Sequence, residues 1–199
     1  MTQQFLGILL SYLLGSIPTA FVLGRACRNI DLRQHGSGNL GATNAFRVLG
    51  PVIGTAVLLI DISKGTLAVI LAHRFLDPGR PLATDLYACL CAITAVAGHN
   101  WTIFMRFKGG KGMATSLGVL IAFSLIVENF GIVMLLVMAL WTLVFFASGI
   151  VSLASIVASI ILPFLSIFFA LPGTYCKYLL PRHFKYCLVI FNFTILLLN

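Results

Sequence analysis

A glycine-rich stretch near the start of the chain, residues 30–50, carries side chains suited to binding a phosphate. It reads G-S-G-N-L-G-A-T-N over residues 36–44. Backbone N–H groups in such a turn form a concave nest for an anion, and a helix beginning near Ala42 would add the positive end of its dipole. The alternative is a polar loop in which the glycines serve only to turn the chain. The glycines and donors that we expect to contribute are Gly36, Ser37, Gly38, Asn39, Gly41, Thr43, Asn44 and Arg47.

A second glycine-rich stretch, residues 99–115, is basic and contains no acid. Lys108 and Lys111 flank Gly109 and Gly110, and an arginine precedes them. The stretch is not a Walker A loop, because a glycine follows Lys111 where that motif has Ser or Thr. Two interpretations remain open: cations that anchor the loop to lipid phosphates, or a second phosphate subsite facing the first.

Three ionisable residues fall in or next to apolar segments. Asp61 and Lys64 are three residues apart, so they share a helix face, and an ionisable pair inside a membrane span is a functional candidate. We favour a structural ion pair that ties the helix to the cytoplasmic loops. His99 is a candidate general base, but the chain has too few acids to build a Ser-His-Asp set. We therefore favour a structural or substrate-hydrogen-bonding role for His99.

Composition identifies the chain as a membrane protein. Of its 199 residues, 60% are hydrophobic and only 9% are charged, against about 25% charged residues in a typical soluble domain. The mean hydropathy is +1.05. The formal net charge of +8 comes from cations between apolar runs, so we explain it by membrane topology and anionic ligands and expect no nucleic-acid partner.

The sequence predicts an all-α, polytopic bundle of about seven transmembrane helices in one domain, residues 1–199. A spanning helix needs about 20 apolar residues. Basic residues follow the first run and none precedes it, which places the N-terminus outside and both glycine-rich stretches on the cytoplasmic face. The basic loop 172–185 disagrees with the positive-inside rule, because counting the spans from an outside N-terminus places this loop outside. The expected spans are 5–24, 51–72, 84–98, 116–127, 130–147, 150–171 and a short last run, 186–198.

These motifs together resemble one family, the bacterial membrane acyltransferases of the PlsY type, which move a fatty acyl group from acyl phosphate to glycerol 3-phosphate. The resemblance extends over residues 14–115, in order and at family-like spacing. Its most specific segments are S-G-N-L-G-A-T-N and F-K-G-G-K-G. The matching segments are G-S-I-P at 15–18, G-S-G-N-L-G-A-T-N at 36–44, D-I-S-K-G at 61–65, G-H-N at 98–100 and F-K-G-G-K-G at 107–112.

The resemblance implies a seven-helix fold in the bacterial inner membrane, an active site facing the cytoplasm, and no metal or cofactor. The glycerol 3-phosphate hydroxyl would attack the acyl carbonyl, giving lysophosphatidic acid and phosphate in the first step of phospholipid synthesis. Because the substrate's own phosphate can take the proton, no protein base is required. By matching position, Ser37, Arg47 and Lys111 are the expected catalytic residues. The expected substrate-binding residues are Gly36, Gly38, Asn39, Gly41, Thr43, Asn44, His99, Lys108, Gly109 and Gly110.

The C-terminal segment departs from the family pattern, which is Arg/Lys-His-x-x-Asn-Ile after the last helix. The chain has Arg182-His183, but Tyr186 stands where Asn is expected. We interpret Arg182-His183 as a chance match in an outside loop and expect the chain as written to be weakly active or inactive.

Two other classes of function are alternatives. A transporter or channel for a phosphorylated solute would also aim helix N-termini at anions, but transporters bind near the bilayer midplane, often between repeats, and no repeat is visible. A scaffold subunit of a membrane complex would not need phosphate-binding donors. The sequence does not indicate an oligomeric state.

The orientation predicts which positions a membrane-impermeant thiol reagent reaches. A single cysteine introduced at Gly38 or Gly110 should react only from the cytoplasm, and one at Gly79 only from outside. The reason is that residues 25–50 and 99–115 contain seven basic residues against one acid, whereas residues 73–83 contain two basic residues against one acid. Labelling of positions 38 and 110 from opposite sides would contradict a single site built from both stretches.

Overall fold

The computed structural model describes residues 2–74, 81–127 and 130–170. Within these ranges the chain is helical, and the described residues contain no β-strand. The helices are α1 (Thr2–Ser16), α2 (Thr19–Arg28), α3 (Ala42–Leu49), α4 (Pro51–Arg74), α5 (Pro81–Asn100), α6 (Met113–Ile126), α7 (Phe130–Ser148) and α8 (Val151–Ala170), with two 3₁₀ turns, η1 (Leu32–Gln34) and η2 (Ile103–Met105).

Four helical segments of the described chain are long and apolar enough to cross a membrane: Gln4–Arg28, Pro51–Ala72, Tyr87–Met105 and Phe130–Ser148. Two shorter apolar helices, Met113–Ile126 and Val151–Ser166, accompany them. This confirms an all-helical membrane protein. The outside N-terminus and the total of seven spans stay predictions, and the run 186–198 and loop 172–185 lie outside the described residues.

The expected first span is broken rather than continuous. α1 ends at Ser16 and α2 begins at Thr19, with Ile17 and Pro18 between them. Proline has no N–H and disfavours helical geometry in the residue before it, which explains the break. α2 ends at Arg28, and the next residue, Asn29, has a left-handed φ of 53°. The Asn29 N–H donates to the Arg25 carbonyl and the Ile30 N–H to the Gly24 carbonyl, each at 3.1 Å.

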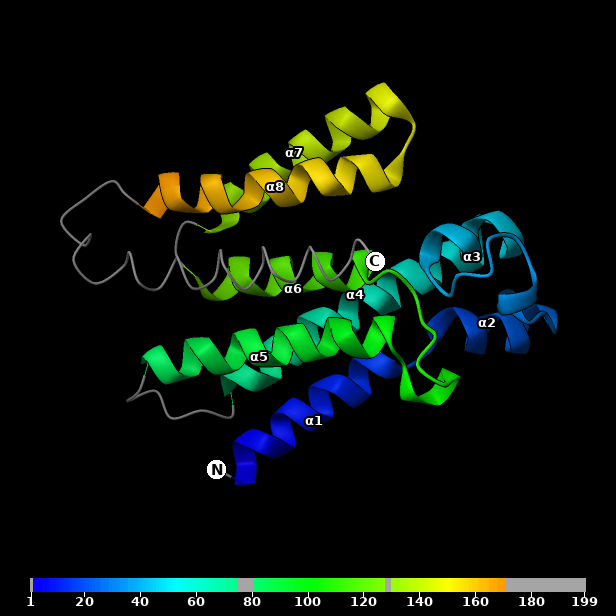
Figure 1. Ribbon diagram of the computed structural model, residues 1–199, viewed down its shortest axis with the longest axis horizontal. Helices are drawn as coiled ribbons and strands as arrows, with labels where there is room; N and C mark the ends of the chain where they lie inside the picture. The colour runs from blue at the N-terminus through cyan, green and yellow to red at the C-terminus, as the bar shows by residue number, and fades with distance from the viewer. Residues whose placement is uncertain (1, 75–80, 128–129, 171–199) are drawn as a thin grey trace. The chain divides into compact units, whose positions relative to one another are not determined.

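The chain divides into two compact units, Met1–Ala122 and Phe123–Asn199. In the first, α1 packs mainly on α5, α4 packs on α5, and α3 packs on α4 (Figure 1). Glycine lets α1 and α5 approach closely, as is common between membrane helices. A Cβ on Gly15 would lie 1.8 Å from the Ala95 carbonyl oxygen, and one on Gly98 would lie 2.3 Å from that of Tyr12.

The second unit contains the hairpin of α7 and α8, which pack against each other (Figure 1). The turn between them includes Gly149, at a φ of +68° that favours glycine. Trp141 Nε1 donates a hydrogen bond of 3.0 Å to Ser155 Oγ, which joins the two helices. None of the residues predicted for the site lies in this unit.

The close contact at Gly15 predicts a stability effect. Gly15→Ala should lower the thermal melting temperature in detergent by several degrees, because the new methyl group would overlap the Ala95 backbone and push α1 from α5. Gly131→Ala in α7 is the matched control, since its Cβ would meet nothing within 4 Å. Equal melting temperatures for the two variants would contradict the packing described here.

Candidate active site

The two glycine-rich stretches lie at the same end of the first unit (Figure 1). α4 and α5 run antiparallel, because Asp61 lies near His99 whereas Ala72 packs with Tyr87. The start of α4, which follows α3, is therefore beside the end of α5. Met105 of η2 packs against the apolar cluster under the first stretch, whose buried members are Ala20, Leu32, Leu40, Ala45, Leu49 and Val57.

The first stretch begins with a buried carboxylate. Asp31, 4% exposed, accepts hydrogen bonds from Arg33 Nε at 3.0 Å and Arg33 Nη2 at 2.7 Å, and Arg25 Nη2 lies 3.4 Å away. The hydrogen-bonded Arg33 guanidinium lowers the pKa of Asp31 to about 2. A depressed carboxyl pKa stabilises the fold above the unfolded value of 3.8, and this contribution is lost as the pH falls through about 2.

Asn44 organises the turn that precedes α3. Its Oδ1 accepts from the backbone N–H of Ser37 at 3.0 Å, and its Nδ2 donates to the carbonyls of His35 and Asn39 at 3.1 and 3.0 Å. Asn44 is buried, and both amide hydrogens are used within the turn. The sequence placed Asn44 among the substrate-binding residues, whereas its contacts are those of a residue that shapes the turn.

The remaining residues of the turn divide by role. Gly36 and Gly38 have φ values of +61° and +72°, which favour glycine, and a Cβ on Gly36 would lie 2.3 Å from Asn44 Oδ1. Asn39 Oδ1 accepts from the Gly41 N–H at 2.8 Å. These four residues therefore give the turn its shape.

Three predicted donors are exposed: Ser37 in the turn, and Thr43 and Arg47 on α3. Thr43 and Arg47 are four residues apart, so they share a face of α3. No side chain caps the N-terminus of α3, whose N-cap residue is Gly41. An uncapped helix N-terminus beside hydroxyls favours an anion, and Arg47 adds a cation from the last turn of α3.

In the second stretch, Gly109 and Gly110 fold the chain back over the end of α5. Their N–H groups donate to the carbonyls of Asn100 and His99, each at 3.0 Å. A Cβ on Gly109 would lie 1.9 Å from the His99 carbonyl oxygen. The N–H groups of both glycines are thus bound to backbone, and their predicted contact with substrate stays a prediction. Lys108 and Lys111 beside them are exposed.

His99 is buried between the second stretch and α4. It is 6% exposed, its Nδ1 lies 3.7 Å from Asp61 Oδ1, and a Cβ on Gly110 would lie 2.1 Å from its Nε2. The two ring nitrogens therefore face opposite neighbours, the carboxylate and the glycine loop. His99 therefore lies among the residues that hold the second stretch against α4, and its contact with substrate stays a prediction.

The expected structural ion pair is present, with Lys64 Nζ 2.8 Å from Asp61 Oδ1 and both side chains buried. The pair bonds to the break in the first span, through Ile17 and Thr19, and Asp61 also lies 3.7 Å from Nδ1 of His99, the first residue of the second stretch. At the break the Ile17 carbonyl accepts from both the Thr19 N–H at 3.0 Å and Lys64 Nζ at 3.1 Å.

Sequence reasoning missed Thr19 and Thr102. Thr19 Oγ1 donates to Asp61 Oδ1 at 3.0 Å, and Thr102 Oγ1 donates to the Ser16 carbonyl. The sequence did offer a signal for both, because helix ends leave backbone groups unpaired and a nearby hydroxyl can bond to them. Thr19 directly follows Pro18, and Thr102 lies close to the end of α5.

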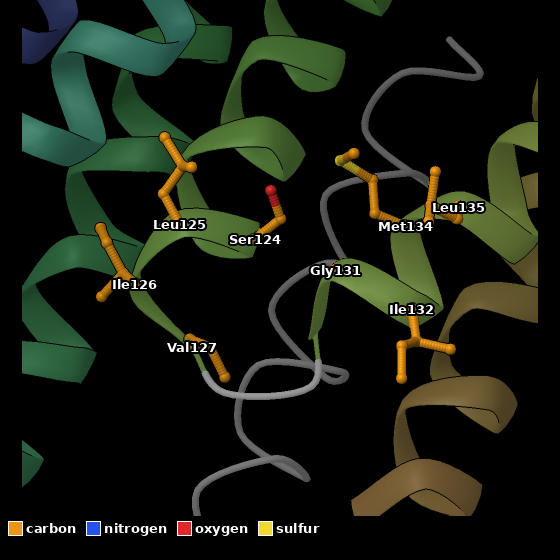
Figure 2. A pocket seen from close by; sticks show the side chains of 8 residues that line it. All are labelled: Ser124, Leu125, Ile126, Val127, Gly131, Ile132, Met134 and Leu135. Atoms are coloured by element: carbon orange, nitrogen blue, oxygen red, sulfur yellow. The ribbon is translucent and has the colours of Figure 1, made fainter.

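An open apolar pocket of about 640 Å³ lies elsewhere, in the second unit, between the end of α6 and the start of α7 (Figure 2). It has no basic side chain, so we do not place a phosphate site there. Its lining residues are Ser124, Leu125, Ile126, Val127, Gly131, Ile132, Met134 and Leu135. Among the described residues, no group of three or more His, Cys, Asp or Glu side chains could hold a metal ion.

The described residues form an integral membrane protein of the all-helical class, and its first unit carries exposed hydroxyls and cations at one end that suit phosphate oxygens. Comparison with known proteins gives the family. The family model described as glycerol-3-phosphate acyltransferase matches residues 5–198, so the chain belongs to that family of membrane acyltransferases. This confirms the resemblance inferred from the motifs.

Relatives and solved structures agree with this membership. The chain is 41% identical to "Glycerol-3-phosphate acyltransferase 2" of Moorella thermoacetica, covering 85% of this chain and 81% of that one. It is 42% identical to a glycerol-3-phosphate acyltransferase of Desulforudis audaxviator, covering 86% and 78%. Crystal structures of PlsY (YgiH), an integral membrane glycerol 3-phosphate acyltransferase, match with TM-scores of 0.75 and 0.74. The glycerol 3-phosphate form is 32% identical over 96% of this chain and 86% of that one, and the lysophosphatidic acid form 30% over 98% and 87%.

The contacts of Asn44 predict that this residue affects turnover by holding the turn before α3 in shape. Asn44→Ala removes three hydrogen bonds, each worth about 1 kcal/mol net, and should speed tryptic cleavage after Arg33 as well as reduce turnover at least tenfold. Gln34→Ala is the control, because Gln34 is an exposed residue of the same segment. If Asn44→Ala behaves like Gln34→Ala in both assays, Asn44 does not hold the turn.

Proposed function

We propose that this chain transfers a fatty acyl group from acyl phosphate to glycerol 3-phosphate, giving lysophosphatidic acid and inorganic phosphate. One observation carries the proposal: the exposed Ser37, Thr43, Arg47, Lys108 and Lys111 come from two stretches that lie at one end of the first unit. The single acid in these stretches, Asp31, is paired with Arg33. Such a set suits two phosphorylated substrates better than one neutral substrate.

The proposed reaction needs positioning and charge stabilisation from the protein. The hydroxyl of glycerol 3-phosphate attacks the acyl carbonyl carbon, an ester C–O bond forms, and the bond to the phosphate leaving group breaks. The proton of the hydroxyl passes to a phosphate oxygen of the substrate, so no protein base enters. Arg47 and Lys111 hold phosphate oxygens and offset the negative charge that develops, while Ser37 and Thr43 orient them.

We place this site at the cytoplasmic face of a bacterial inner membrane and treat residues 1–199 as one catalytic domain. The support is the charge asymmetry of the sequence, since both basic stretches fall on one side when spans are counted from an outside N-terminus. The relatives named above are bacterial proteins. The acyl phosphate donor follows from the PlsY-type resemblance.

The direct test is phosphate release by the purified protein. We expect slow release from acyl phosphate, because Tyr186 stands where the family pattern has Asn. The release should occur only when glycerol 3-phosphate is present, with one lysophosphatidic acid formed per phosphate. A transporter for a phosphorylated solute, the alternative function, would instead move glycerol 3-phosphate into sealed vesicles without forming product. Uptake without acyl transfer would overturn the proposal.

Two cations should dominate the kinetics. Lys111→Ala and Arg47→Ala are each expected to reduce turnover at least tenfold, about 1.4 kcal/mol of transition-state stabilisation. Steady-state rates of phosphate release measure the effect, and thermal melts in detergent confirm that each variant is folded. Arg28→Ala is the matched control, because Arg28 is an exposed cation at the end of α2 and outside both stretches. Wild-type rates for both site variants would remove these residues from the site.

A further inference from the structure

The buried pair of Asp61 and Lys64 lies where the first span breaks. Lys64 Nζ donates to the Ile17 carbonyl at 3.1 Å, and Asp61 Oδ1 accepts from Thr19 Oγ1 at 3.0 Å. Ile17 and Thr19 flank Pro18, so the two contacts hold both sides of the break. They fix the start of α2 against the middle of α4.

The same break is bonded to the second glycine-rich stretch. Thr102 Oγ1 donates to the Ser16 carbonyl, and Tyr12 Oη donates to the Trp101 carbonyl at 2.7 Å. His99, which opens that stretch, lies 3.7 Å from Asp61 through its Nδ1. Asp61 thus lies between α2, which leads into the first stretch, and the histidine that begins the second.

One feature of the pair is unusual for a purely stabilising contact. Asp61 is 1% exposed, and its Oδ2 has no hydrogen-bond partner among the described residues. A buried ion pair contributes little net stability unless its remaining lone pairs are satisfied, and apolar replacement of both partners is often neutral. Stability alone is therefore a weak reason for two charges at this place.

We propose that Asp61 and Lys64 are positioning residues for the acyl transfer, which set the angle at which α2 leaves α1 and thereby align the two glycine-rich stretches. This inference rests on the proposed function. When Lys64 is lost, the Ile17 carbonyl keeps its local bond from the Thr19 N–H at 3.0 Å but loses its tie to α4, so α2 shifts. A displacement of about 1 Å at the reacting groups can cost two orders of magnitude in rate. Because Arg47 and Lys111 still attract phosphate, kcat should fall more than the KM for glycerol 3-phosphate changes.

The first test uses threonines, because valine matches threonine in shape and the variants are expected to fold. Thr19→Val removes the hydroxyl that bonds Asp61 and should reduce kcat at least fivefold, with a KM within threefold of wild type, whereas Thr19→Ser should restore kcat. Thr66→Val is the matched control: Thr66 Oγ1 donates to the carbonyls of Ile62 and Gly118 and joins α4 to α6, away from the break. Equal loss of kcat in Thr19→Val and Thr66→Val would overturn the proposal.

The second test does not depend on activity. Asp61→Asn combined with Lys64→Met removes both charges together, so neither is left buried alone. Hydrogen–deuterium exchange of this variant should rise by at least tenfold in residues 17–24 and 100–107 and stay unchanged in α7, measured below its melting temperature. Unchanged exchange in the first two segments would overturn the positioning role, even if the wild-type protein proved inactive on acyl phosphate. Raised exchange in the variant, together with uptake of glycerol 3-phosphate but no acyl transfer by the wild type, would instead reject the proposed function alone.

Discussion

A backbone carbonyl inside an apolar bundle must find a hydrogen-bond donor, and this constraint organises the first unit. Pro18 breaks the first span, and the carbonyls of Ser16 and Ile17 then bond to side chains from distant segments, Thr102 and Lys64. Lys64 in turn needs a counter-ion at this depth, which Asp61 provides. The break, the ion pair and the second stretch are therefore parts of one connected set of contacts.

The candidate site is built on top of these contacts. α2 leads to the first stretch, where Asn44 and Asp31 shape the turn and leave Ser37, Thr43 and Arg47 exposed. Glycines in the motifs also allow close approach of other groups, as at Gly36, Gly109 and Gly110, where a Cβ would lie 2.3 Å or less from its neighbour. The chemistry thus depends on a few exposed donors, and most residues of both stretches hold those donors in place.

Sequence reasoning predicted the helical membrane fold, the family and the two basic stretches, because each of these follows from local composition and spacing. It did not separate shaping residues from binding residues. An asparagine side chain offers the same donors and acceptor to a phosphate as to a backbone turn, so the role of Asn44 became visible only from its three contacts. The contact between Lys64 and Ile17 joins residues 47 apart in the chain, which no local pattern indicates.

The central claim is that both glycine-rich stretches act on the same bound substrate. The most direct measurement is a double-mutant cycle for the equilibrium binding of glycerol 3-phosphate. Titration calorimetry gives the binding free energy of each of its four members: the wild type, Arg47→Ala, Lys111→Ala and the double variant. The two cations come from different stretches, so a shared ligand predicts a coupling of at least about 1 kcal/mol between them. Losses that add to within about 0.5 kcal/mol, as expected for independent sites, would contradict a single site.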